Sequence, residues 1–175
     1  MLKRMPALAA LVTLAVPVVA QEIAKSGKVD VKFQLHYVQT VKDLDTNGGM
    51  KAYVNEGFVF AQSGTPGGLL DGSAGRCVGY GFYSDKTFAG REDGRCTFSD
   101  ADKDQVFEVY SVSGSGGDAP WAGTGTFEGG TGKYEGIKAD FEIHPVMLGA
   151  PAEGHQMFAG TKTGTYSIEK TAAAN

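Results

Sequence analysis

Apolar and polar residues alternate along a segment that follows the N-terminal region of this chain. Within residues 31–41, Phe33, Leu35, Tyr37 and Val41 fall on one side of an extended backbone, and most residues between them are polar. Successive side chains of a β-strand point to opposite faces of a sheet. The alternation therefore predicts a strand with one buried face.

Further segments have a strand-like pattern, and no long segment has a helical period. They are residues 51–62, 77–83, 94–98, 105–112, 121–127, 138–145 and 156–169. Asn47-Gly48 predicts a hairpin turn after the first strand, and the residues rich in Gly, Pro and Ser at 63–75 and 113–120 predict loops. About eight strands with turns between them indicate a single all-β domain, either a sandwich or a barrel.

Several glycines lie within these predicted strands. They are Gly79, Gly81, Gly125, Gly160 and Gly164. Glycine inside a strand suits the bends of a sheet that closes on itself, so these positions favour the barrel.

Residues 123–137, with the sequence GTGTFEGGTGKYEGI, are the most distinctive stretch of the chain. This stretch resembles the strand–turn–strand of the allene oxide cyclase-like and dirigent-like barrels. The resemblance implies an eight-stranded antiparallel closed β-barrel with an apolar cavity, often trimeric and sometimes dimeric. Members of these families include cyclases, stereochemistry-guiding proteins and uncharacterised secreted proteins. The matching glycines turn the backbone and carry no catalytic group, so no catalytic residue is transferred.

Residues 1–20 have the pattern of a secretory signal. Lys3 and Arg4 form a positive region, residues 7–16 form a short apolar run, and small residues precede the expected cleavage after Ala20. A membrane anchor is the alternative, but the apolar run is short and Pro17 follows it. We therefore expect a periplasmic or secreted domain of residues 21–175, with no membrane association after cleavage.

The charge of the chain argues against nucleic acid as a partner. The net charge is −4, and removal of Lys3 and Arg4 with the signal makes it more negative by two units. A protein that binds a phosphate backbone needs a basic surface.

Cys77 and Cys96 are the two cysteines of the chain. Export places them in an oxidising compartment, and only one pairing exists. We predict a disulfide that closes a loop of about 20 residues and stabilises the fold by about 3 kcal/mol. The alternative is a reactive thiol pair, which the long separation disfavours.

Glu108 and Tyr110 are the candidate catalytic residues, because they share one face of the predicted strand 105–112. If that face lines the lumen, burial would raise the pKa of the Glu108 carboxyl and suit it to acid–base chemistry. Tyr110 would then orient a substrate oxygen. If Phe107 and Val109 face inward instead, Glu108 is exposed, and the alternation alone does not choose between these faces.

Aromatic residues are the candidates for lining a ligand pocket, since they combine a large apolar area with a polar tip. Each of them also suits a plain core or a subunit interface. Arg76, beside Cys77, is a candidate for binding a carboxylate at the mouth, or it is an exposed charge. The aromatic candidates are Tyr53, Tyr80, Phe82, Tyr83, Trp121 and Phe158.

Two acidic segments, residues 43–48 and 100–104, have the spacing with which a calcium loop begins. The first has Val54 where a bidentate Glu is required, and the second has Gln105 where Gly is required. We therefore favour solvated turns, although two acidic loops at the same end of a barrel could share an ion.

Histidines give no indication of a zinc site. His36 and His155 are isolated in the sequence, and His144 shares one face of its strand with Asp140 and Glu142. Polar residues in such a row are typical of the solvent side of a barrel wall, so no metal is expected.

Three functional hypotheses follow. The first is a barrel that binds a small apolar molecule in its lumen. The second is a cyclase, isomerase or lyase whose cavity orients a hydrophobic substrate. The third is a structural or interaction barrel without a ligand. The glycines fit neither nucleotide-binding spacing and no serine nucleophile motif occurs, so no cofactor is expected, and a homo-oligomer is possible on the resemblance.

Overall fold

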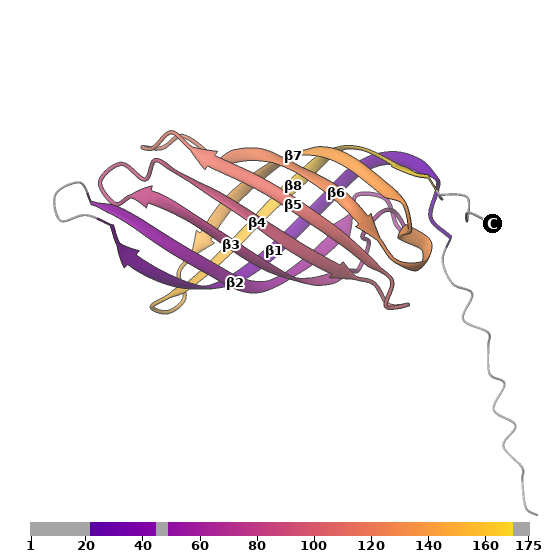
Figure 1. The fold of residues 1–175 in the computed structure, drawn as a ribbon, viewed down its shortest axis with the longest axis horizontal. Coiled ribbons are helices and arrows are strands. Elements are labelled where there is room, and N and C mark those ends of the chain that lie inside the picture. The colour runs from indigo at the N-terminus through magenta and orange to yellow at the C-terminus, as the bar shows by residue number, and fades with distance from the viewer. Residues whose placement is uncertain (1–21, 45–48, 170–175) are drawn as a thin grey trace, which may run out of the picture.

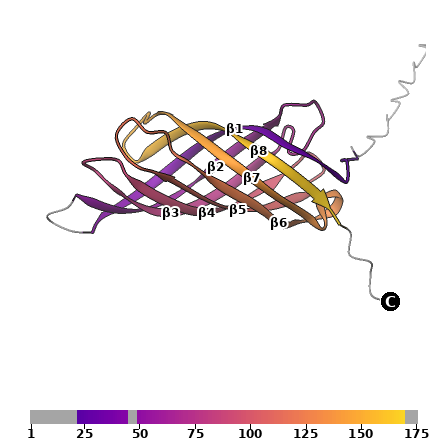
Figure 2. The same cartoon turned by 90° about the horizontal axis from the view of Figure 1, so that it is seen from above.

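The protein is an eight-stranded antiparallel β-barrel in the computed structural model, which describes residues 22–44 and 49–169. Each strand pairs with its neighbours in the sequence, and β8 pairs with β1 to close the sheet (Figures 1 and 2). The strands are β1 (Ser26–Asp43), β2 (Met50–Ser63), β3 (Ala74–Ser84), β4 (Gly90–Ser99), β5 (Gln105–Gly114), β6 (Ala122–Gly130), β7 (Ile137–Gly149) and β8 (His155–Ile168). The predicted all-β closed barrel is therefore confirmed.

Alternation along each strand separates an inner face from an outer face. In β1 the side chains of Val31, Phe33 and Tyr37 are buried inside the barrel, as the sequence pattern predicts. Leu35 lies opposite Val59 of β2 on one side and opposite Phe158 of β8 on the other. Because consecutive strands are antiparallel, β1, β3, β5 and β7 finish at one end of the barrel. The turns after β2, β4 and β6, the start of β1 and the end of β8 lie at the opposite end.

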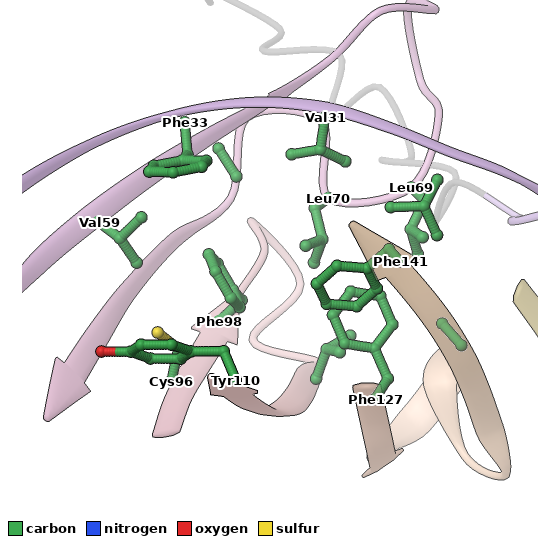
Figure 3. Close-up of a cluster of buried hydrophobic side chains, with 14 of the residues drawn as sticks. Val31, Phe33, Val59, Leu69, Leu70, Cys96, Phe98, Tyr110, Phe127 and Phe141 are labelled. Carbon is green, nitrogen blue, oxygen red and sulfur yellow. The ribbon is translucent and has the colours of Figure 1, made fainter. Parts of the chain in front are cut away.

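A loop closes the second of these ends. Residues 64–73 connect β2 to β3, and Leu69 and Leu70 of this loop are buried among the inward side chains. Figure 3 shows Leu69 and Leu70 with the rings of Phe127 and Phe141. Leu70 has a φ of 59°, a left-handed conformation that is unfavourable for leucine, and its burial compensates for this cost. We call this end the closed end.

Glycines on the inner face make room for large side chains on neighbouring strands. A Cβ at Gly160 would lie 2.5 Å from the ring of Phe33, and one at Gly79 would lie 2.5 Å from the Glu92 carboxylate. These glycines were predicted to allow bends of the sheet. The structure gives them a further purpose, since they let bulky and charged groups occupy the lumen.

Cys77 and Cys96 lie directly opposite each other on β3 and β4, with their sulfur atoms at disulfide-bonding distance. The predicted disulfide is therefore present, and it lies in the barrel wall, with both residues buried.

The predicted signal, residues 1–20, lies outside the described residues. Within residues 22–44 and 49–169, no helix has the length and apolarity needed to cross a membrane.

Candidate ligand-binding lumen

A cavity of about 450 Å³ occupies the half of the barrel away from the closed end. Phe88 and Met147 line it, although they are 61% and 53% exposed, so the cavity reaches the solvent between them. Trp121 also lines this opening, which we call the mouth. Towards the closed end, Phe98 and Leu70 are buried and fill the interior, so the cavity ends above them.

Polar residues from four strands gather in the wall of this cavity. We call them the polar cluster: Tyr37 of β1, Tyr53 and Asn55 of β2, Glu92 of β4 and Tyr110 of β5. All five are buried. A buried polar group is costly unless it is hydrogen-bonded, so the partners of these side chains matter for both folding and binding.

Glu92 is the acceptor at the centre of the polar cluster. The Tyr110 hydroxyl donates to its Oε1 at 2.7 Å, and Asn55 Nδ2 donates to its Oε2 at 2.7 Å. The Tyr53 hydroxyl lies close enough to this carboxylate to affect its pKa. The hydroxyls of Tyr110 and Tyr37 lie 2.7 Å apart, which extends the network to β1.

Burial raises the pKa of the Glu92 carboxyl, although the hydrogen bonds from Tyr110 and Asn55 and the nearby Tyr53 hydroxyl oppose the effect. The pKa values of the tyrosines are raised as well, chiefly by burial and in part by the nearby Glu92 charge. The tyrosines therefore stay protonated and act as hydrogen-bond donors.

A buried ion pair lies between the polar cluster and the closed end. Lys162 Nζ of β8 donates to Glu108 Oε2 of β5, and the two residues are only 3% and 2% exposed. Rings surround the ammonium group, with the centroid of Phe98 4.7 Å away and that of Phe33 5.4 Å away. Burial raises the pKa of Glu108 and lowers that of Lys162, and each partner opposes the shift of the other. Both residues line the cavity, so it ends on a charged pair set among aromatic faces.

Several residues selected from the sequence face this cavity. Glu108 and Tyr110 point inward, which decides between the two faces that the sequence left open, and Phe107 faces outward. Tyr53, Trp121 and Phe158 also line the cavity, and so does Tyr83.

The lumenal positions predicted for Tyr80 and Phe82 are wrong. Both lie on the outer wall, where they are 62% and 46% exposed. Cys77 points inward, so the alternation of β3 puts Gly79 inside and Tyr80 outside. A structural disulfide at Cys77 favours an inward position for that residue. Counting in twos from Cys77 then predicts that Tyr80 and Phe82 face outward and Tyr83 faces inward.

Arg76 does not lie at the mouth. It faces outward from β3 and forms an ion pair with Glu56 of the neighbouring strand. Its alternative interpretation as an exposed charge is the one that fits the structure.

Asn55, Glu92 and Lys162 were not predicted from the sequence. Glu92 precedes the strand predicted at residues 94–98, whereas β4 begins at Gly90. Asn55 and Lys162 stand at inward positions of strands that were predicted, between apolar or glycine residues of the same face. A polar residue at an inward position was the signal that could have identified both.

His36 and His155 are isolated in the sequence but lie side by side in the structure, because β1 and β8 are neighbours in the closed barrel. Their rings stack with centroids 5.2 Å apart, and His36 Nε2 lies 3.1 Å from His155 Nδ1. Asp140, Glu142 and His144 face the solvent, as predicted. Among residues 22–44 and 49–169, no group of three or more His, Cys, Asp or Glu side chains is placed to hold a metal ion.

Asp43 and Asp100, with which the two acidic segments begin, lie at opposite ends of the barrel, so these two carboxylates do not share an ion. Asp43 ends β1 on the side of the mouth, and residues 45–48 lie outside the described residues. Asp100 begins the turn after β4 at the closed end. There its Oδ1 accepts hydrogen bonds from the backbone N–H groups of Asp102 and Asp104, and its Oδ2 lies 2.7 Å from Lys133 Nζ.

Asp100→Asn is expected to lower the free energy of unfolding by about 1.5–3 kcal/mol at pH 7, the range for hydrogen bonds to a charged group. Burial alone would raise the pKa of Asp100, but the hydrogen bond and charge of Lys133 outweigh it and the pKa is lowered. A carboxyl with a lowered pKa in the folded protein stabilises the fold above its unfolded pKa of about 3.9, and this stabilisation disappears as the pH falls through the folded value.

Denaturant titrations from pH 7 to pH 2 test this prediction. The difference between the unaltered protein and Asp100→Asn should shrink below about pH 4. Asp102→Asn is the matched control, because Asp102 also contacts Lys133 but is more exposed. An equal loss in both variants, or a difference independent of pH, would contradict the assignment.

Comparisons with known proteins add no relative to this picture: no family model matches the chain, and no curated protein matches it in sequence. The lumen has an apolar wall, the polar cluster and a buried ion pair, and these features are the basis for a proposed function.

Proposed function

We propose that this protein is exported and binds a small, mainly apolar molecule in the lumen of its barrel. The observation that carries the proposal is the cavity of about 450 Å³, which opens at Trp121 and contains the polar cluster. Ligand sites are typically concave and mostly apolar, with a few placed polar groups that orient the ligand. A barrel of eight strands has an interior wide enough for one small ligand.

The cavity argues against a barrel that only assembles. In a purely structural barrel, inward side chains would fill the lumen along its length, as they do towards the closed end. An unfilled apolar volume loses packing contacts, so a bound molecule would recover stability that the empty barrel lacks.

A second candidate function is an enzyme that isomerises or cyclises its ligand. The buried carboxylate of Glu92 favours it, because a carboxyl with a raised pKa beside a tyrosine hydroxyl is suited to proton transfer. Glu108 is less suited to this role, since Lys162 occupies it in the ion pair. Glu92 and Tyr110 are therefore the catalytic residues we propose for this candidate.

The proposed export and oligomerisation are supported by separate features. A disulfide agrees with an oxidising compartment. Outward apolar side chains gather on β2 and β3, where a second copy of the chain could cover them. They include Phe58, Phe60, Val78, Tyr80 and Phe82.

Native mass spectrometry of protein purified from its native host tests these proposals together. We expect a complex with a retained molecule that is released by unfolding, and the same spectrum reports the number of subunits. Binding is then measured by calorimetry with that molecule in the unaltered protein and in Trp121→Ala, which should weaken binding by about tenfold through lost apolar contact at the mouth. Phe107→Ala, on the outer wall of β5 and away from the apolar side chains of β2 and β3, is the control.

Incubation of the recovered molecule with fresh protein separates binding from catalysis. A binder returns the molecule unchanged, whereas an enzyme returns an isomer, and Glu92→Gln should then abolish the conversion while the molecule still binds. Absence of a retained molecule, together with no calorimetric binding of apolar compounds of this size, would reject the ligand-binding proposal.

A further inference from the structure

One acceptor atom of the polar cluster has no partner. Asn55 is 1% exposed, and its Oδ1 accepts no hydrogen bond from any group that the structure describes. Its Nδ2 is held by Glu92, so the amide group is fixed with its oxygen as the remaining polar atom. Asn55 lines the cavity, and a buried acceptor without a donor is unfavourable. The unmatched oxygen therefore indicates a donor supplied by a ligand.

Tyr37 and Tyr110 use their hydroxyl hydrogens within the polar cluster. Tyr110 donates its one hydroxyl hydrogen to Glu92, so the hydrogen shared with Tyr37 must come from the Tyr37 hydroxyl. The hydroxyl oxygens keep free lone pairs, but neither Tyr37 nor Tyr110 retains a hydroxyl hydrogen for an incoming group.

The charges of the lumen also favour a ligand that donates a hydrogen bond over one that carries a negative charge. Glu92 is held by neutral donors, and the cation that lines the cavity near it, Lys162, is already paired with Glu108. An entering carboxylate would meet Glu92 without a cation to compensate, and like charges at short distance in a buried site are strongly unfavourable.

We propose that the lumen selects an apolar molecule whose polar end donates a hydrogen bond, an alcohol or an ammonium group, and rejects molecules with a carboxylate at that end. The inference rests on the proposed ligand-binding function and specifies its ligand class. The donor group reaches Asn55 Oδ1 and the oxygens of the neighbouring tyrosines, and the apolar part extends past Phe158 towards Trp121 at the mouth. The buried polar atoms thereby provide selectivity, because an analogue without the donor leaves them unmatched.

Four probes built on one skeleton test the donor preference by calorimetry: 1-(2-naphthyl)ethanol, 1-(2-naphthyl)ethylamine, 2-acetonaphthone and 2-naphthoate. They have nearly the same size and apolar area, but only the first two donate a hydrogen bond from the polar end. We expect the alcohol and the amine to bind at least about tenfold more tightly than the ketone, and the carboxylate to bind least. The alcohol and the amine together also show whether a positive charge adds to the effect.

Asn55→Leu tests the atom itself. It should reduce the difference between the alcohol and the ketone to less than about threefold while leaving ketone binding nearly unchanged. Tyr83→Phe is the control, since Tyr83 lines the cavity outside the polar cluster and its substitution should preserve the difference. If Asn55→Leu does not fold, the comparison of the four probes in the unaltered protein still tests whether the lumen prefers a hydrogen-bond donor.

The outcomes separate the two proposals. Equal binding of all four probes would overturn the donor preference, as expected if a water molecule satisfies Asn55, and would leave ligand binding standing. Tightest binding of the ketone or the carboxylate would also overturn it. Binding of none of the probes would overturn the donor preference, and together with the absence of a retained molecule in the native mass spectrum it would overturn the ligand-binding proposal as well.

Discussion

Lys162→Met is expected to lower the free energy of unfolding by about 3–5 kcal/mol, because it leaves the Glu108 carboxylate buried without its partner. Glu108→Leu should have a similar cost, since it leaves the ammonium group of Lys162 buried among aromatic rings. Denaturant unfolding at pH 7, followed by tryptophan fluorescence and circular dichroism, measures both losses.

The double variant Lys162→Met/Glu108→Leu distinguishes an unpaired charge from lost packing. Apolar residues of similar size often replace a buried ion pair without loss of stability, so the double variant should recover most of what either single variant loses. Arg95→Met provides a matched control, because the ion pair of Arg95 with Glu128 is exposed and should contribute less than about 1 kcal/mol. Additive losses in the double variant would contradict this account of the pair.

Removal of the disulfide has the second large effect. The variant Cys77→Ala/Cys96→Ala is expected to be less stable by about 3 kcal/mol, because the bond restricts a loop of about 20 residues in the unfolded chain. For a domain of this size, that loss lowers the melting temperature by about 6–12 °C.

A reductant serves as the internal control for the disulfide. It should lower the melting temperature of the unaltered protein towards that of the double alanine variant and leave the variant unchanged. Equal melting temperatures with and without the reductant in the unaltered protein would show that the bond does not stabilise the fold.

Strands could be predicted from the sequence where apolar and polar residues alternate along them. In β1 the inner face is nearly all apolar, so alternation located this strand, and the Asn47-Gly48 hairpin signal indicated the strand that follows it. The start of β4 was missed because Arg91, Glu92 and Asp93 are consecutive charged residues, which are typical of a turn. They are tolerated in a strand because Asn55 and Tyr110, distant in the sequence, satisfy Glu92 across the lumen.

The inner face of β5 could not be chosen from the sequence for the same reason. Each face of that strand mixes apolar and polar residues, and a glutamate on the inner face is unfavourable unless a cation is buried with it. The cation is Lys162, 54 residues away, which only the closure of the barrel brings to Glu108. Local patterns thus reveal the apolar part of the lumen, whereas its polar groups depend on pairs formed by the complete fold.

Within the part of the chain that the structure describes, Leu69 and Leu70 close one end of the barrel, and the cavity opens at the other end beside Trp121. A molecule inside such a barrel cannot be pushed out from behind, so a competitor must wait until the resident has left. The rate of exchange should then equal the spontaneous release rate, whatever the concentration of the competitor. A protein with this kinetic behaviour would retain its ligand after dilution, and the residues at the mouth would set the rate of release.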